Sequence, residues 1–504
     1  MTEREWREAT DLKPSTLWLA VTLAVAAIFR LWAPGHGIPW AVDPQEAENI
    51  GRVLAIMRSG DYNPHAFDQP GLIFWLHLPV ACARFLLGAM RGDWTSLAGV
   101  PLEALVPWAR VFTAIAGVAT VAIVHQVGMR WGARHALIAA GLLAVMPLHV
   151  AASRQATGTV PLTLFTTLCL LLSLVAHERA RPRAFAWAGV AAGLACATSY
   201  GGALALPLPL LAAWMTYPGR PSRLAYVLSA VGAALATYLV VAPFTLFDLP
   251  GFLNGFAAFS TDFRARTTGV SPRAWLVYLV EVRRALGWPA LLLLVAGFTM
   301  GVVRAVRGPG RVRWALIVVF PVLVYVVISR RGEPDTSALL PAIPVACVLA
   351  GNAVISGVSL LRRFSIPRAP RTALIVALTV AALLPPFLGT VAFTRGVRAP
   401  TTAAAAWRWV DAHARPGQGL AVERDVIHLP VDRFPTVRVA DVGERLVQDY
   451  RDAQVSLLVV GPADGLGPDA RARRDAVLRE AREVARFSPD GRRRGPEITI
   501  HLLP

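Results

Sequence analysis

Two short segments carry residues whose types and spacing could do chemistry, and a further set of residues could bind a charged partner. The first segment is Asp43-Pro44-Gln45-Glu46, and the second is GDYNPHAFDQPGLIFWL at 60–76. Carboxylates can bind a divalent cation or accept a proton from an attacking hydroxyl. The further set consists of arginines that could contact phosphate, namely Arg264, Arg266, Arg330 and Arg331.

The acidic segment also has an interpretation without chemistry. Asp43 followed by a proline, with Glu46 three residues later, is the pattern of a helix N-terminus, in which Asp43 caps the helix. The next apolar residues recur at helical spacing and predict a short amphipathic helix on the membrane surface: Ile50, Val53, Leu54 and Met57. Capping and catalysis both stay open for Asp43.

In the second segment, glycine, asparagine and proline favour turns, and two side chains could serve as polar ligands. These are His65 and Asp68. A single histidine in a turn is more often simply solvated, so the segment carries weight only in combination with other motifs.

The elements that must hold these residues are membrane-spanning helices. Of the 504 residues, 55% are apolar and 16% are charged, against about 25% charged residues in an average soluble domain. About 20 apolar residues in helical form cross a bilayer. Twelve apolar runs are candidates: 15–33, 71–90, 106–128, 135–153, 158–177, 184–198, 201–216, 224–247, 287–303, 314–329, 338–360 and 372–394.

The arginines set the expected topology. Although the net charge is +18, the arginines are spread over short loops between apolar runs, which argues against nucleic acid as a partner and marks those loops as cytoplasmic. The stretches 35–70 and 248–286 are then extracytoplasmic, and the N-terminus is a cytoplasmic, uncleaved anchor. Twelve crossings do not fit this pattern, so either 71–90 is interfacial or re-entrant and eleven spans remain, or 71–128 hides another crossing and there are thirteen.

Beyond the last apolar run the composition becomes that of a soluble domain. The sequence therefore divides into a transmembrane domain at 1–394 and a small extracytoplasmic α/β domain at 395–504. Within the latter we expect helices at 401–414 and 468–486 and strands at 455–460 and 497–503. Nothing in it has the spacing of a metal site or a nucleophile.

In their order along the chain, these segments resemble the GT-C superfamily of membrane glycosyltransferases, specifically the family 39 branch of protein O-mannosyltransferases and bacterial aminoarabinose transferases. There an acidic pair opens the first extracytoplasmic loop, a helix follows, and then comes a GD-x-NPH-x-F-x-x-P-x-L segment similar to 60–72. Supporting similarities are ATGTVPLTLF at 156–165, PFTLFDLPGFLNG at 243–255, LGWP at 286–289 and GPEITIHLL at 495–503.

The resemblance implies a mainly α bundle of GT-C type. It implies inverting transfer of a sugar from a polyprenyl-phosphate donor to a lipid, glycan or protein acceptor at the outer face of a bacterial plasma membrane. Asp43 would be the catalytic carboxylate with Glu46 as its partner, and Asp43 would also be the ligand if a divalent metal takes part. The substrate-binding residues would be Gln45, His65, Asp68, Arg154, Arg264, Arg266, Arg330 and Arg331.

The chain departs from the family pattern at three ionisable positions. Aligned on Gly60, the acidic pair falls on Gln45 and Glu46, so a glutamine stands where the family has its principal aspartate. Thr159 and Ser199 stand where the family commonly has an aspartate and a lysine. Either Asp43 has taken over the role of base, or the chain is a non-catalytic relative that binds lipid-linked sugar. A transporter is a third class, but the expected spans almost lack the intramembrane acids and lysines that couple transport.

Overall fold

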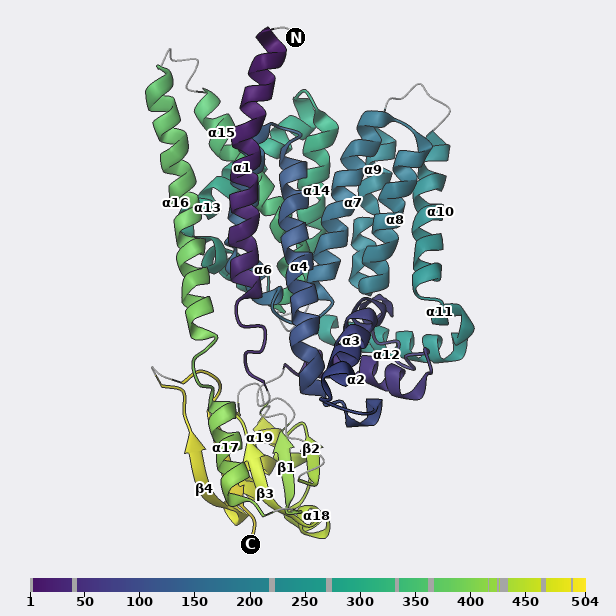
Figure 1. The fold of residues 1–504 in the computed structure, drawn as a ribbon, viewed down its shortest axis with the longest axis vertical. Coiled ribbons are helices and arrows are strands. Elements are labelled where there is room, and N and C mark those ends of the chain that lie inside the picture. The colour runs from purple at the N-terminus through teal and green to yellow at the C-terminus, as the bar shows by residue number, and fades with distance from the viewer. Residues whose placement is uncertain are drawn as a thin grey trace. The chain divides into compact units, whose positions relative to one another are not determined.

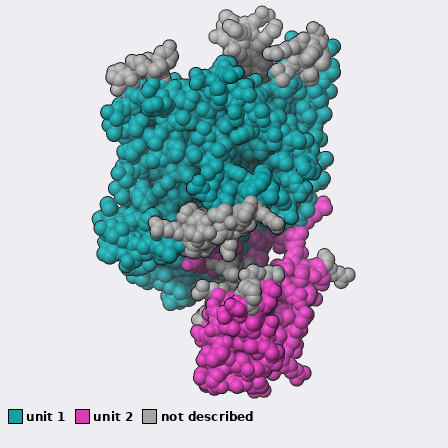
Figure 2. All heavy atoms as spheres, turned by 180° about the vertical axis from the view of Figure 1, so that it is seen from behind, with its two compact units in different colours: residues 1–34, 49–393 teal, residues 35–48, 394–504 magenta. Residues whose placement is uncertain are grey.

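The described part of the chain forms two compact units in the computed structural model, distinguished by colour in Figure 2. Unit 1 comprises residues 1–34 and 49–393, and unit 2 comprises residues 35–48 and 394–504. The structure describes residues 3–38, 43–216, 223–268, 274–330, 335–360, 367–415, 417–423, 426, 434–463, 468–490 and 493–504.

The described secondary structure of the transmembrane unit is helical, and all twelve predicted apolar runs coincide with helices. Figure 1 shows its long helices side by side in one bundle. The helices are α1 (Glu3–Leu31), α2 (Pro44–Ser59), α3 (Leu72–Arg91), α4 (Leu102–Gly128), α5 (Ala133–Ala144), α6 (Pro147–Ala152), α7 (Thr159–Arg179), α8 (Pro182–Thr198), α9 (Pro207–Met215), α10 (Arg223–Val241), α11 (Phe244–Phe247), α12 (Leu249–Thr268), α13 (Ala274–Arg307), α14 (Arg311–Ile328), α15 (Ile343–Leu360) and α16 (Arg368–Gly396). Short 3-10 turns are η1 (Leu97–Gly99), η2 (Tyr200–Ala205) and η3 (Thr336–Ala342).

Eight helical segments among the described residues are long and apolar enough to cross a membrane. Three shorter apolar segments join them: Thr16–Leu31, Ala133–Ala144 and Tyr200–Met215. The chain is thus an integral membrane protein, as its composition predicts. The stretch predicted as a second extracytoplasmic loop, 248–286, is itself mostly helical, because it contains α12 and the start of α13, which kinks at Gly287.

Close helix packing in the bundle uses small residues. On α8, a Cβ added at Gly189 would stand 2.1 Å from the carbonyl oxygen of Ala230 on α10, and one at Gly193 would stand 2.4 Å from that of Ala234. The four-residue spacing on both helices is the small-xxx-small arrangement by which helix backbones approach each other in membranes. Any larger residue at either glycine would separate α8 from α10.

The arginine-rich loops meet at one end of the bundle. Glu178, at the end of α7, pairs with Arg130 after α4 and, at 3.2 Å, with Arg313 at the start of α14. The hydroxyl of Tyr226, at the start of α10, donates to the carbonyl oxygen of Ala180 at 2.7 Å. The ends of α4 and α7 and the starts of α10 and α14 therefore lie at the same end of the bundle, as the predicted topology requires.

The helix α3 has both of its ends tied to α2. Just before α3, Gln69 Nε2 donates to Asn49 Oδ1 at 2.7 Å. Just after it, the Arg58 guanidinium donates to three carbonyl oxygens in the segment 97–100 at 2.9–3.2 Å. α3 therefore returns the chain to the end of the bundle where it began, and Figure 1 places α2 and α12 at that end too. The interfacial alternative for 71–90 stays a prediction, because α3 is also one of the eight segments long and apolar enough to cross a membrane.

Unit 2 contains a five-stranded sheet of order β2-β1-β3-β5-β4, with helices on both faces. The first three strands in that order are parallel, and β5 is antiparallel to both of its neighbours. Trp407 on α17 is buried against Phe434 on one face, and Tyr450 on α18 is buried on the other. The elements are α17 (Thr402–His413), β1 (Gly419–Glu423), β2 (Thr436–Val439), α18 (Val447–Asp452), β3 (Val455–Val460), α19 (Pro468–Glu480), β4 (Arg482–Phe487) and β5 (Ile498–Leu502).

One predicted helix in this unit is too long. The sequence predicts a single charged helix at 468–486, but α19 ends at Glu480 and the remainder forms β4. β4 pairs with β5 from Arg482 to Phe487, and Arg486 bridges Glu483 and Glu497 at 2.8 and 2.9 Å. The long-range partner strand decides the conformation here, because the local composition suits either state.

Candidate functional site

The start of α2 holds the acidic segment. Asp43 Oδ1 accepts the backbone N–H of Gln45 at 2.9 Å and that of Glu46 at 3.4 Å, so Asp43 caps α2. The Gln45 side chain is exposed, whereas Glu46 is fully buried. The catalytic role of Asp43 stays a prediction.

The loop Gly60–Pro70, here called the NPH loop, is held by its own polar side chains. His65 Nε2 lies 2.8 Å from Asp61 Oδ2, and Arg52 Nη1 on α2 donates to Asp68 Oδ1 at 3.0 Å. Asn63 Nδ2 donates to Asp248 Oδ2 at 2.8 Å. His65 and Asp68, the predicted ligands, therefore both take part in contacts that shape the loop.

Two carboxylates in this region titrate below their ordinary range. The pKa of Asp61 is lowered, first by the hydrogen bond from His65 and then by the backbone N–H of Asn63. The pKa of Asp248 is lowered, first by the hydrogen bond from Asn63 and then by the backbone N–H of Gly251. In the sequence, the segment around Asp248 stands out only as a supporting similarity. Its hydrogen bond to the NPH loop spans 185 positions and leaves no local signal.

Of the arginines predicted as substrate-binding residues, Arg154 is the one that the structure describes as buried. Arg330 is exposed in the turn after α14. Arg331 lies outside the described residues, and so do the side chains of Arg264 and Arg266, whose backbone belongs to α12.

Arg154 follows α6 and is only 2% exposed. Its Nη2 donates to the carbonyl oxygen of Trp32, and its guanidinium lies 5.6 Å from the ring of Phe393. Within the described part of the chain, Nε and Nη1 have no hydrogen-bond partner. Burial, and secondarily the charge of Arg110, lower the pKa of Arg154 to about 10. A buried cation with unfilled donors is suited to an anionic ligand, because a desolvated charge is costly unless it is paired.

Two of the positions that depart from the family pattern, Thr159 and Ser199, offer only neutral groups. Thr159 begins α7, where its Oγ1 accepts from Thr157 Oγ1 at 3.4 Å. Ser199 connects α8 to η2, and Gly158 stands close enough to Thr198 for a Cβ to lie 3.6 Å from its carbonyl oxygen. These positions therefore carry hydroxyl groups where the family commonly has a carboxylate and an ammonium. In the described part of the chain, no three His, Cys, Asp or Glu side chains are placed to hold a metal ion.

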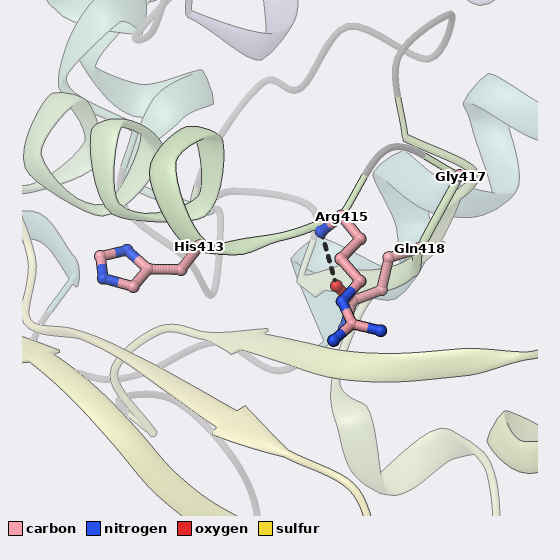
Figure 3. Close-up of a pocket in the computed structure, with 4 residues that line it drawn as sticks. All are labelled: His413, Arg415, Gly417 and Gln418. Carbon is pink, nitrogen blue, oxygen red and sulfur yellow. Dashed lines mark hydrogen bonds between the residues drawn. The ribbon is translucent and has the colours of Figure 1, made fainter.

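A separate polar hollow of about 550 Å³ lies on unit 2, at the start of β1 (Figure 3). Arg415 donates from its backbone N–H to Gln418 Oε1 at 2.9 Å, and Gln418 Nε2 donates to Ser456 Oγ at 2.7 Å. His413 turns away from this pair in Figure 3 and stacks on Trp409, with ring centroids 4.5 Å apart. These groups satisfy one another and do not assemble into a reactive constellation.

The helix bundle and the small sheet domain confirm the predicted fold class, and the chain has the fold of the two solved structures described below. The family model described as dolichyl-phosphate-mannose-protein mannosyltransferase matches residues 89–247. The chain is similar to the crystal structure of ArnT from Cupriavidus metallidurans bound to undecaprenyl phosphate, with 17% identity and a TM-score of 0.58 over 97% of each chain. It is also similar to archaeal oligosaccharyltransferase AglB from Archaeoglobus fulgidus, in complex with an inhibitory peptide and a dolichol-phosphate, with 13% identity and a TM-score of 0.59 over 94% of this chain and 73% of that one. No curated protein sequence matches the chain.

Proposed function

We propose that this protein is a membrane glycosyltransferase that transfers a sugar from a polyprenyl-phosphate donor to an acceptor on the extracytoplasmic face. The fold supports this proposal, and so do the ligands named for two similar structures, undecaprenyl phosphate for ArnT and a dolichol-phosphate for AglB. Both ligands are isoprenoid lipids that carry a phosphate. A donor of that kind needs a cationic group within reach of the bilayer.

The observation that carries the proposal is the state of Arg154. Its guanidinium is buried, and two of its nitrogen atoms lack partners among the described residues. In a membrane protein, a desolvated cation with unfilled donors is a candidate functional site. The donor phosphate would accept from Nε and Nη1 in the paired geometry that guanidinium offers to phosphate oxygens.

Asp43 is the proposed base and Glu46 its partner. The acceptor hydroxyl oxygen attacks the anomeric carbon, its proton passes to the Asp43 carboxylate, and the bond from the anomeric carbon to the phosphate oxygen breaks. Polyprenyl phosphate leaves, and Arg154 stabilises the charge that develops on it. Attack opposite the leaving group inverts the anomeric configuration. Gln45 cannot accept the proton, so the role falls to Asp43 in this chain.

The proposed topology has eleven spans. α3 is interfacial, and η2 with α9 and η3 with α15 each make one crossing. The N-terminus is cytoplasmic, and both the NPH loop and the domain at 395–504 are extracytoplasmic in a bacterial plasma membrane. The gathered arginine loops and the return of α3 to α2 support this arrangement.

Sugar transfer from a panel of labelled polyprenyl-phosphate sugars, in liposomes containing the purified chain, tests the function. We expect transfer by the wild type, loss of transfer in Asp43→Asn, which can still cap α2, and near wild-type transfer in the matched control Glu48→Gln. In Gln45→Asp the added charge beside Asp43 raises one carboxyl pKa and slows transfer.

Two other outcomes would favour the rivals. A silent wild type that Gln45→Asp activates would indicate a degenerate site in a lipid-binding relative. Movement of the intact lipid-linked sugar without transfer would indicate a transporter. A transporter has little support, because transporters generally couple through acidic residues within their spans. Here Glu103 and Glu178 lie at helix ends, and Glu281 lies in α13 before its kink.

A further inference from the structure

We infer that Asp248 is a positioning residue for the reaction, because it fixes the NPH loop against α12 and through that loop sets the placement of α2. The inference rests on the proposed function. Asp248 lies between α11 and α12 and belongs to neither the acidic segment nor the arginine set.

Both carboxylate oxygens of Asp248 are engaged. Oδ1 accepts the backbone N–H of Gly251 at 3.1 Å, which caps the start of α12, and Oδ2 accepts from Asn63 Nδ2 at 2.8 Å. Nδ1 of His65 also lies 3.9 Å from Oδ2. Asn63 in turn accepts the backbone N–H of His65 on its Oδ1 at 3.1 Å. One carboxylate thus links the start of a helix to the turn at the centre of the NPH loop.

Apolar contacts bring the NPH loop and α12 together but do not fix the position of the loop along the helix. Phe67 packs edge-on against Phe252, with centroids 6.0 Å apart, and a Cβ added at Gly255 would stand 2.7 Å from the Cβ of Phe67. The hydroxyl of Tyr200 donates to the carbonyl oxygen of Phe67 at 2.9 Å. Aromatic packing tolerates small shifts, whereas the hydrogen bond from Asn63 to Asp248 has a direction. The polar pair therefore sets the register.

The other end of the loop is bonded to α2. Gln69 donates to Asn49 at 2.7 Å, and Asn49 Nδ2 donates to the carbonyl oxygen of Ala156 at 3.4 Å, two residues after Arg154. α2 is the helix that Asp43 caps. A continuous set of hydrogen bonds therefore runs from Asp248 through the NPH loop to the helix with the proposed base and the segment with the proposed phosphate ligand. Displacements of about 1 Å in such a frame can cost up to about a hundredfold in rate.

A role confined to capping α12 makes a different prediction from a positioning role. Asparagine is as good an N-cap as aspartate, so Asp248→Asn would be silent if Asp248 only capped α12. In the positioning role, the asparagine introduced by Asp248→Asn uses its oxygen for Gly251 and turns its amide N–H₂ toward the Asn63 amide, so that two donors face each other. The variant Asn63→Asp instead places two carboxylates face to face. The double variant Asn63→Asp/Asp248→Asn restores a donor–acceptor pair with the direction reversed and keeps both the cap and the acceptor for His65.

The experiment compares these three variants with the wild type in the liposome transfer assay and in hydrogen exchange of residues 60–70. We expect each single variant to lose roughly tenfold or more in kcat, with the donor KM little changed. Hydrogen exchange in the loop should be faster in each single variant. The double variant should regain wild-type behaviour in both measurements. Single variants as active as the wild type would overturn the inference, and so would a double variant no better than the singles. If the wild type transfers no sugar, the proposed function fails. Independently of transfer, hydrogen exchange of residues 60–70 that is unchanged in both single variants would refute the role of Asp248 in fixing the NPH loop.

Discussion

Arg30 Nη2 donates to Nδ1 of His149 at 2.9 Å inside the bundle, 119 positions away in sequence. The same guanidinium donates to the carbonyl oxygens of Leu143 and Ala144 at 2.9 Å. These carbonyls belong to the last turn of α5, which ends before Pro147, and the Leu143 oxygen also accepts the backbone N–H of Met146 at 3.3 Å. An arginine at the end of α1 thus supplies the donors and the charge that the end of a broken membrane helix needs.

The first prediction concerns this contact. Arg30→Leu should destabilise the bundle by about 3 kcal/mol, because it removes the guanidinium donors of buried carbonyl oxygens and of a buried imidazole. Thermal unfolding in detergent should show a clearly lower Tm for Arg30→Leu than for the wild type. The control is Arg84→Leu, since Arg84 pairs with exposed Asp93 at 3.2 Å. Equal losses in the two variants would contradict the role assigned to Arg30.

The second prediction concerns topology. A reporter fused after Arg395 should be active only outside the cytoplasm, and one inserted within 305–312 only inside it, because the arginine loops meet at one end of the bundle. A third fusion at 92–96, after α3, should be extracytoplasmic if α3 is interfacial. A cytoplasmic reporter at 92–96 would refute the eleven-span arrangement, and the first two reporters on the same side would refute the whole topology.

The third prediction is a pH dependence of the NPH loop. Hydrogen bonds lower the pKa of both Asp61 and Asp248 in the folded protein, so the stabilisation they provide is present above the unfolded pKa near 4 and is lost as the pH falls below it. Hydrogen exchange at 60–70, corrected for the intrinsic rate, should stay constant from pH 7 to about 5 and accelerate below about 4. Residues of α4 serve as the internal reference. A loop whose protection is unchanged at pH 3 would contradict the assignment.

The fourth prediction concerns a buried ion network in unit 2. Arg474 lies 3.5 Å from Glu423 and 3.3 Å from Asp441, and all three side chains are at most 10% exposed. Arg474→Ala should destabilise this unit by about 3–5 kcal/mol, because two carboxylates stay buried without their cation. Hydrogen exchange of β1 and β3 in the full chain measures the loss. Arg479→Ala on the exposed side of the same helix should change little, and similar effects of the two substitutions would count against the network.

The parts of this fold that the sequence predicts are those with local periodicity. The twelve apolar runs, the amphipathic α2 and the cap at Asp43 follow from residue spacing within one or two helical turns. β4 could not be distinguished from a helix, because its conformation depends on pairing with β5, and the return of α3 depends on Arg58, which contacts a segment some forty positions away.

In the candidate site too, some residues could be predicted from local sequence and others only from long-range contacts. Asp43 and the NPH loop stand out in the sequence by composition. Asp248 does not, because its importance comes from its hydrogen bond with Asn63. Arg154 differs from the exposed Arg330 in the burial that packing imposes on it. Contacts over such separations follow from the assembled bundle and have no signature within a sequence window.

The most direct test of the central claim is the rate of sugar release from a labelled polyprenyl-phosphate donor, measured against donor concentration for the wild type and Arg154→Ala. Loss of a charged hydrogen-bond donor should raise the donor KM by about tenfold or more. Arg304→Ala, at the other end of the bundle against Trp314, should leave the donor KM unchanged. A donor KM equal in the wild type and Arg154→Ala would contradict the phosphate site, and a wild type that releases no sugar from any polyprenyl-phosphate donor would contradict the account as a whole.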